Sequence, residues 1–289
     1  VPALPVLKEN GLEPLVLSYK EGLSMLNGTI TVTALGLLAL YESITALKNA
    51  ELAGAMCYEA LRGTTKALDP RIHANKHHEE QGSSADNLRR MLAGSNICEN
   101  HVNDKVQDAY VMRCVGHIHG ARKTLEKEAY EVIVDEMHSV SDNPEIFAEG
   151  ENDGVALMSG NFDGSFVGAH ADMISMACAI IGKVVERGTD RMVNRNLNDG
   201  LPAFLVSNPG LNSGFMIPQY VTAGLLGDIA LLCAPAAAFN AAVSAGQESP
   251  VYRDDTAARQ LYQAVQKLRS NEAILKKPSI AETLDWAAA

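Results

Sequence analysis

Three side chains near the middle of the sequence have the types and the spacing of a pocket for a carboxylate. Gln107, Tyr110 and Arg113 are separated by steps of three residues, so on one continuous helix they would lie along a slowly drifting stripe. The planar guanidinium of arginine can bind a carboxylate through two hydrogen bonds, and the phenol and the amide can contact the rest of a small molecule. The residues alone favour a second interpretation, in which the three side chains form a buried structural network.

Two further segments contain polar groups that could do chemistry. Asn27 stands before a glycine, at the expected start of a long helix. Because asparagine is common at such turns, an ordinary helix entry is the alternative to a functional amide. The glycine-rich run 160–168 contains neither GxxxxGK nor GxGxxG, so it is not predicted to bind phosphate.

Three histidines and a glutamate lie close together in the sequence. They are His73, His77, His78 and Glu79. The segment has no HExxH pattern and reads as a loop, whereas a helix would place spaced ligands on one face. We therefore predict no metal site.

The elements that must position these residues are predicted to be helices. Apolar residues recur at spacings of three and four, and convincing alternation with period two is absent, so we expect an all-α bundle of long helices with functional loops at its ends. These helices are expected over 29–61, over 84–94 with Ser84 as its cap, over 103–138 and 167–197, over a stretch that ends near 239 and kinks at Pro218, over 257–269, and from Ser279 to Glu282.

The segments between the expected helices read as loops. Residues 64–82 are expected to be irregular, and residues 148–166 are glycine-rich. Pro144 disfavours helical geometry at the residue before it, so Asn143 should lie in an extended or turn conformation. We expect one helical core with active-site loops over residues 1–250 and a short helical tail over residues 251–289.

The composition limits the class of partner. The chain has 289 residues, of which 35 are acidic and 24 are basic, and its net charge of −11 argues against a nucleic-acid surface. Five widely spaced cysteines without a CxxC pair indicate reduced thiols and a cytoplasmic protein. The most apolar stretch, 229–244, is alanine-rich and too short for a membrane span.

A series of short motifs runs in a fixed order from residue 11 to residue 248. They are GLEPL (11–15), KEGLSMLNGT (20–29), DPRIH (69–73), KVQDAYVMRC (105–114), SDNP (141–144), SGNF (159–162), GLPAFL (200–205), LNSGFM (211–216) and QE (247–248). Together they resemble the C-terminal part of the aromatic amino acid ammonia-lyase and aminomutase family, typified by histidine ammonia-lyase. The resemblance implies a long-helix bundle of the fumarase/aspartase-like type and a tetramer whose active sites draw residues from several subunits.

The family's chemistry depends on an electrophile, a methylidene-imidazolone (MIO) group formed from an Ala-Ser-Gly tripeptide. Such a group is needed because the β-proton of an amino acid is barely acidic and ammonia is a poor leaving group. The protein adds a base, a carboxylate clamp and electrostatic support. The resemblance implies that Arg113 holds the substrate carboxylate with help from Asn143, and that Tyr110 is the base near the amine and the β-carbon.

The resemblance also implies roles for four other residues. Asn27 and Gln107 would hydrogen-bond the MIO ring or the substrate. Phe162 would pack against the ring. Glu248 would lie near the substrate amine or side chain.

The sequence departs from the family pattern at several places. It contains no Ala-Ser-Gly; in the family, this tripeptide and a catalytic loop tyrosine precede the point that matches Val1. Asp163 stands where members usually have His or Gln, and Ser249–Tyr252 replaces a run close to Asp-His-Val-Ser-Met. Gly227–Ile229 replaces a run of the Glu-Asn-Lys type.

Three interpretations follow. In the first, the chain is a C-terminal subunit or fragment of a lyase or aminomutase acting on an aromatic or histidine-like amino acid, and a second polypeptide supplies the electrophile within a hetero-oligomer of tetrameric type. In the second, it is an electrophile-free isomerase, dehydratase or cyclase that uses Tyr110 and Glu248 as acid and base. In the third, it is a non-catalytic assembly subunit. The choice between elimination and 2,3-amino migration stays open.

Overall fold

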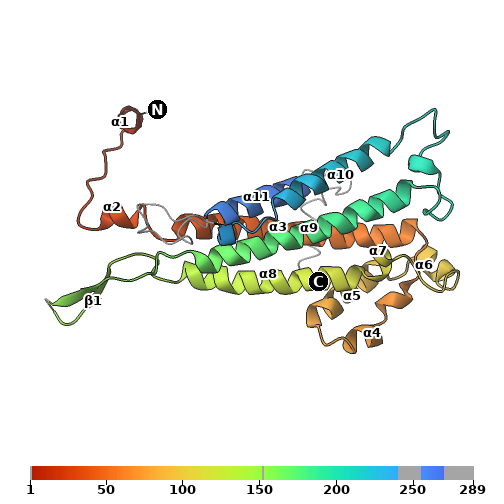
Figure 1. Cartoon of the computed structure of the whole chain (residues 1–289), viewed down its shortest axis with the longest axis horizontal. Helices are drawn as coiled ribbons and strands as arrows, with labels where there is room; N and C mark the ends of the chain where they lie inside the picture. Colours follow the sequence, from red (N-terminus) through yellow and green to blue (C-terminus); the bar gives the residue numbers. More distant parts are fainter. Residues whose placement is uncertain (1, 152, 240–254, 270–289) are drawn as a thin grey trace.

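Long helices lie side by side in an elongated bundle (Figure 1). The computed structural model describes residues 2–151, 153–239 and 255–269. The long helices are α3 (Ile30–Ala60), α8 (Val115–Met137), α9 (Ser165–Val193), α10 (Met216–Leu231) and α11 (Asp255–Arg269). The predicted helical bundle is confirmed, and α3 and α9 match the expected helices 29–61 and 167–197 within a few residues.

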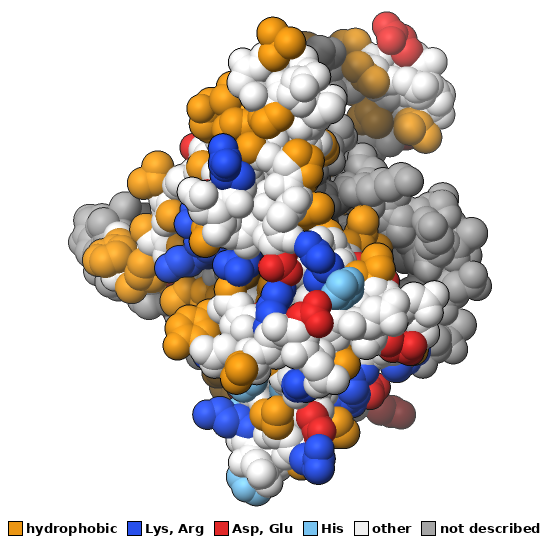
Figure 2. Space-filling model, turned by 90° about the vertical axis from the view of Figure 1, so that its right-hand side faces the viewer, with side chains coloured by type: hydrophobic (Ala, Val, Ile, Leu, Met, Phe, Trp, Pro, Cys, Tyr) orange, Lys and Arg blue, Asp and Glu red, His pale blue; other side chains and the backbone are white. Residues whose placement is uncertain are grey.

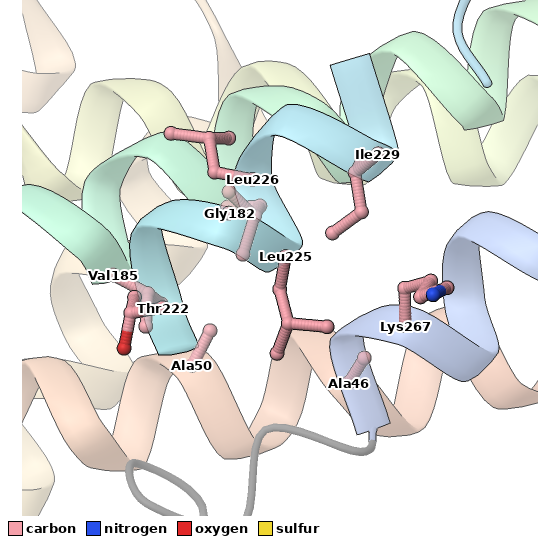
Figure 3. A pocket seen from close by; sticks show the side chains of 10 residues that line it. Ala46, Ala50, Gly182, Val185, Thr222, Leu225, Leu226, Ile229 and Lys267 are labelled. Carbon is pink, nitrogen blue, oxygen red and sulfur yellow. The ribbon is translucent and has the colours of Figure 1, made fainter. Parts of the chain in front are cut away.

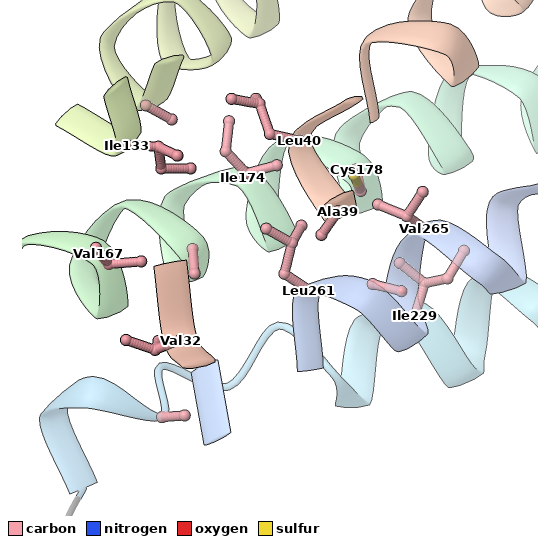
Figure 4. Packing of buried hydrophobic residues seen from close by; sticks show 14 residues of the cluster. Val32, Ala39, Leu40, Ile133, Val167, Ile174, Cys178, Ile229, Leu261 and Val265 are labelled. Atoms are coloured by element: carbon pink, nitrogen blue, oxygen red, sulfur yellow. The ribbon is translucent and has the colours of Figure 1, made fainter. Parts of the chain in front are cut away.

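One apolar core joins all the long helices. Leu40 of α3, Ile133 of α8, Ile174 of α9, Ile229 of α10 and Leu261 of α11 are buried in the same cluster (Figure 4). Burying a side chain of this size contributes about 1.5–3 kcal/mol. The helix that follows residue 254 therefore packs into the same core as the helices before residue 240. The domain boundary expected at residue 250, the residue Glu248 and the short helix 279–282 lie outside the described residues.

Short helices connect the long ones. They are α1 (Ala3–Glu9), α2 (Glu21–Ser24), α4 (Pro70–Ala74), α5 (Glu79–Met91), α6 (Asn96–His101) and α7 (Tyr110–Arg113), with 3-10 turns η1 (Thr65–Leu68), η2 (Ala203–Leu205) and η3 (Ala237–Phe239). The prediction that Ser84 caps a helix is wrong, because α5 begins five residues earlier and Ser84 is buried inside it.

The prediction of one helix over residues 103–138 is also wrong. The chain is extended at Ala109, α7 begins at Tyr110, and a break at Cys114 separates α7 from α8. Two contacts explain the interruption: the Thr64 backbone N–H donates to Asp108 Oδ2 (2.6 Å), and the Tyr58 hydroxyl donates to the carbonyl oxygen of Met112 (2.8 Å). Groups at the end of α3 and just beyond it therefore bond to residues 108 and 112 and favour the interrupted conformation over a continuous helix.

A small antiparallel hairpin, which the sequence pattern does not predict, precedes α9. Strands β1 (Glu145–Ala148) and β2 (Gly154–Leu157) pair with Glu145 opposite Leu157 and Ala148 opposite Gly154. Most residues of both strands are exposed. With no buried face, a strand shows no alternation of apolar and polar residues, so its sequence carries little signal.

The expected kink at Pro218 is wrong. Helix α10 begins at Met216, so Pro218 falls in its first turn. Backbone N–H groups in the first turn make no hydrogen bond within the helix, so the N–H that proline lacks is not needed there. The helix ends at Leu231, and the 3-10 turn η3 follows it.

A buried polar network crosses the middle of the bundle. Arg122 Nη2 lies 2.7 Å from Glu126 Oε1 and donates to the carbonyl oxygen of Ser43 (2.6 Å), while the Ser43 hydroxyl donates to Glu126 (2.8 Å). Burial raises the pKa of Glu126, and Arg122 opposes that shift. Because buried charges must be paired, the network links α3 and α8 at one register.

Among the described residues, α3 and α9 are long and apolar enough to span a membrane by length and composition. In the structure, 44% of the most apolar window of α3 and 50% of that of α9 are buried. Both are central helices of the bundle, and this packing accounts for their apolar character.

Candidate active-site residues at the two ends of the bundle

Asn27, Asn143 and Phe162 lie at the end of the bundle that carries the hairpin; we call this group the hairpin-end residues. Asn27 precedes α3, Asn143 precedes β1, and Phe162 lies in the turn before α9. Gly28 has a φ of +83°, and a Cβ there would lie 1.9 Å from the carbonyl oxygen of Ser141. Only glycine fits this close approach, so the turn at Asn27 lies directly against the segment that leads to Asn143.

Asp142 holds this arrangement together. Its Oδ2 accepts a hydrogen bond from the Ser24 hydroxyl (2.9 Å) and lies 3.1 Å from Lys20 Nζ. The backbone N–H of Asn143, together with Lys20 and Ser24, lowers the pKa of Asp142. The carboxylate therefore ties α2, just before Asn27, to the segment that contains Asn143.

The side-chain amides at this end have donors to offer. Asn143 Oδ1 accepts from the backbone N–H of Ser159 (3.0 Å), which turns the amide so that its NH₂ group points away from Ser159. The side chain of Asn27 makes no hydrogen bond with any residue that the structure describes. Phe162 is half-buried. Two amides and an aromatic ring suit the polar and apolar edges of a small ring or of a carboxylate.

Gln107, Tyr110 and Arg113 lie at the opposite end; we call this group the α7-end residues. Arg113 Nη1 donates to Gln107 Oε1, and Arg113 Cζ lies 4.7 Å from the centre of the Tyr110 ring. The spacing of the three residues predicts that they lie together on one helix. They are together, but Gln107 precedes the helix and reaches Arg113 from outside any helix or strand.

The α7-end residues are open to solvent in this chain. Tyr110 is 71% exposed and Arg113 is half-buried. Figure 2 looks onto this end and shows lysine and arginine side chains gathered around its middle, with a few acidic groups among them. A guanidinium that is stacked on a phenol and held by an amide can receive a carboxylate. The alternative of a buried structural network is wrong, because Tyr110 and Gln107 are exposed.

The two groups are separated by the length of the bundle (Figure 1). Asn27 precedes the first residue of α3, whereas α7 lies against the last turn of the same helix through the bond from Tyr58 to Met112. Helix α3 has 31 residues, which corresponds to about 46 Å at 1.5 Å per residue. One copy of the chain therefore does not bring the hairpin-end and α7-end residues into one site.

Two hollows lie away from these residues. A small apolar one of about 20 Å³, lined by Ala46, Ala50, Leu225 and neighbours, lies between α3, α9 and α10, close to α11 (Figure 3). Another of about 40 Å³ lies behind α7 and is lined by Met112 and the buried His119. Neither is lined by Tyr110 or Arg113.

The histidine segment holds no metal cluster among the described residues, where no group of three or more possible ligands gathers. His73 is buried, with Nδ1 2.9 Å from Gln81 Nε2 and Nε2 3.2 Å from the carbonyl oxygen of Ala67. Burial lowers the pKa of this imidazole. His73 therefore packs α4 against α5.

Comparisons with known proteins agree with this fold and with the motif order. The family model for aromatic amino acid lyases matches residues 1–275. The chain belongs to the aromatic amino acid lyase family. It is 42% identical to histidine ammonia-lyase of Geobacillus kaustophilus, a match over 95% of this chain and 54% of that protein.

Solved structures of the family share the helical fold. The crystal structure of histidine ammonia-lyase from Trypanosoma cruzi has a TM-score of 0.84 and 33% identity, and the match covers 99% of this chain and 56% of that one. Tyrosine aminomutase from Streptomyces globisporus has a TM-score of 0.88 and 28% identity, with 95% and 55% covered. The chain spans about half the length of the curated relatives it matches.

Sequence reasoning did not single out the residues that hold the lyase motifs in place. Asp142 at the hairpin end, and Lys105 and Asp108 at the α7 end, lie inside the motifs SDNP and KVQDAYVMRC. Their partners are distant in sequence, since Ser24 and Thr64 bond to aspartates 118 and 44 residues away. The only available signal was a charged residue beside each expected functional residue.

Proposed function

We propose that the chain contributes two different half-sites to the active sites of a carbon–nitrogen lyase or aminomutase that acts on an aromatic or histidine-like amino acid. The supporting observation is that both sets of family residues are present but lie at opposite ends of the bundle. A complete site then combines the hairpin-end residues of one subunit with the α7-end residues of another, in an oligomer of tetrameric type. In a closed symmetric assembly, symmetry repeats the same contact between subunits, so every hairpin end can meet the α7 end of a neighbouring subunit.

Each half-site has a defined task in this proposal. Arg113 binds the substrate carboxylate through its guanidinium, with the amide of Asn143 from another subunit as a second donor. Tyr110, next to Arg113, lies near the amine and the β-carbon as the proposed base. Gln107 and Asn27 donate hydrogen bonds to the substrate or to the MIO ring, and Phe162 packs against the ring; Glu248 is proposed to lie near the substrate amine or side chain.

The donor set fits an MIO group. Two amides and a half-buried aromatic ring are the chemistry that a small polar ring requires, although no precursor tripeptide occurs in the 289 residues. When bound, the group supplies the electrophile that activates the amino acid. We propose that a second polypeptide provides it, so that activity depends on this partner. No metal is part of the proposal.

The cysteines support a reducing location. All five are free thiols, and burial raises the pKa of Cys57 to about 11, which makes this thiol unreactive near neutral pH. We propose that the enzyme works in the cytoplasm.

Mass spectrometry and borohydride treatment test the proposal together. The natural assembly, purified and denatured, should contain a second polypeptide carrying Ala-Ser-Gly. Ammonia release from histidine, phenylalanine or tyrosine should be lost after borohydride treatment, because borohydride reduces the electrophile. Activity that survives borohydride would favour the electrophile-free isomerase, dehydratase or cyclase. A partner whose turnover is the same with Tyr110→Phe and Arg113→Ala subunits would favour a scaffold.

A further inference from the structure

The segment just before α7 is fastened by a buried carboxylate. The side chain of Asp108 is 3% exposed, and its Oδ2 accepts a hydrogen bond from the backbone N–H of Thr64 (2.6 Å). Thr64 in turn donates from its hydroxyl to the carbonyl oxygen of Val102 (2.9 Å). The chain leaving α3 is therefore bonded to the chain entering α7 at two points, Asp108 and Val102.

Lys105 connects this carboxylate to two other segments. Its Nζ lies 3.6 Å from Asp108 Oδ1, forms an ion pair with Asp199, and donates to the carbonyl oxygen of Leu61 (2.9 Å). Arg62 also donates to the carbonyl oxygen of Asp199. Lys105 is thus the cation at which the end of α3, the segment 105–108 and the turn after α9 meet.

The end of α3 forms a close-fitting seat for α7. A Cβ on Gly63 would lie 2.4 Å from Met112 Cε and 2.6 Å from Tyr58 Cδ1, so a larger residue here would have to displace the Met112 methyl group and the Tyr58 ring. The Tyr58 hydroxyl fixes the carbonyl of Met112 (2.8 Å), and burial followed by the nearby Asp108 carboxylate raises the pKa of Tyr58. Tyr58 therefore stays a hydrogen-bond donor at neutral pH.

We infer that Asp108, paired with Lys105, is a positioning residue for the substrate-carboxylate clamp. The inference rests on the proposed function. Gln107 directly precedes Asp108 and lies outside any helix, so no helical hydrogen bond holds it in front of Arg113. The bonds of Asp108 to Thr64 and of Lys105 to α3 hold it there instead. Asp108 touches no substrate in this account; it acts through Gln107 and Arg113.

Two substitutions separate the parts of this contact. Asp108→Asn keeps an oxygen that can accept from the Thr64 N–H but loses the attraction to Lys105, whereas Asp108→Ala loses both. In the active assembly, we expect Asp108→Ala to lower kcat/KM about 10- to 100-fold, mainly through a higher KM, because a misplaced clamp binds the substrate carboxylate less well. Asp108→Asn should fall between this variant and wild type.

Asp104→Asn is the matched control, because Asp104 lies in the same segment, is exposed, and pairs with His101. It should keep wild-type kinetics. Wild-type KM in Asp108→Ala, a loss confined to kcat, or equal effects of Asp104→Asn and Asp108→Asn would overturn the inference.

Amide hydrogen exchange tests the same contact without activity. In the isolated full chain, Asp108→Ala should speed exchange over residues 105–113 at least tenfold while α9 keeps its protection; unchanged exchange over 105–113 would overturn the inference. If the wild-type assembly has no lyase or aminomutase activity, the proposed function fails, and the exchange measurement still decides whether Asp108 fixes this segment.

Discussion

Arg113 carries the most specific chemistry at the scale of a single residue. Its guanidinium is oriented from two sides, by the Gln107 amide and by the Tyr110 ring. An ammonium group has the same charge but cannot offer two parallel donors to a carboxylate. Orientation, rather than charge alone, therefore distinguishes this arginine.

Arg113→Lys should raise KM for the amino acid and lower kcat/KM. The decrease in kcat/KM should correspond to a loss of about 2–3 kcal/mol of binding free energy, the range for a lost charge-assisted hydrogen bond. Steady-state kinetics of the assembly measure it. Arg71→Lys is the control, since Arg71, on the exposed surface of α4, pairs with the neighbouring Asp69. Equal KM values for Arg113→Lys and wild type would remove Arg113 from the carboxylate clamp.

His119 makes stability depend on pH. Burial, followed by the charges of Arg122 and Lys123, lowers its pKa from 6.5 to about 3. In the unfolded chain this imidazole takes up its proton near pH 6.5, so between pH 6.5 and 3 the unfolded state binds more protons and stability falls as the pH falls. Above pH 6.5 the contribution is fully present.

The substitution His119→Leu should reduce this slope by about one proton, or about 1.4 kcal/mol per pH unit. Urea unfolding at several pH values between 4 and 6 measures it. His73 and His117, whose pKa values burial also lowers, should retain part of the slope. An identical slope in wild type and His119→Leu would mean that His119 is protonated in the folded protein.

At the scale of elements, α5 and α8 pack through small residues. A Cβ on Gly120 would lie 2.4 Å from Cα and 2.5 Å from the backbone nitrogen of Gln81. Backbone cannot move aside as a side chain can. The two helices can therefore approach this closely only because residue 120 has no side chain.

We expect Gly120→Ala to destabilise the fold by about 1–3 kcal/mol through overpacking. Gly82→Ala, in the facing helix α5, meets nothing within 4 Å and should be neutral or stabilising by up to about 1 kcal/mol. Chemical denaturation of both variants compares them. If Gly120→Ala were as stable as Gly82→Ala, the close packing of α5 on α8 would be wrong.

The elements that were predicted correctly are those whose signal is local. Helices α3 and α9 are rich in apolar residues over about thirty positions each, and runs of this length and composition identify helices. The segment 103–109 also has helical composition, but Thr64 bonds to Asp108 across 44 residues of sequence, and Tyr58 bonds to Met112, just beyond the segment, across 54 residues. No local pattern contains that information, and the exposed hairpin lacked a pattern altogether.

The candidate site shows the same limit. The sequence brought Gln107, Tyr110 and Arg113 together correctly, because they lie within seven positions of one another. It could not place Asn27 about 46 Å from them, because that distance depends on the length and direction of α3. Sites shared between subunits were implied by the family resemblance and not by the residues themselves.

At the scale of the whole molecule, the account depends on active sites that form between copies of the chain. The segment that precedes α2, residues 2–20, which we call the N-terminal arm, supports an assembled state. Its apolar side chains Leu15, Val16 and Tyr19 are at least 75% exposed. Exposed apolar area of this kind is unusual on a monomer. The arm lies at the hairpin end (Figure 1), beside one of the two half-sites.

Subunit complementation tests this central claim most directly. Asn143→Ala removes a hairpin-end residue and Arg113→Ala an α7-end residue, so assemblies of either variant alone should be inactive. After the two are unfolded, mixed in equal amounts and reassembled with the electrophile-bearing partner, random pairing leaves about one quarter of the sites with both wild-type halves. The account predicts that about one quarter of wild-type ammonia release or amino migration returns. A mixture as inactive as the separate variants, beside a wild-type sample that regains activity in the same procedure, would contradict it.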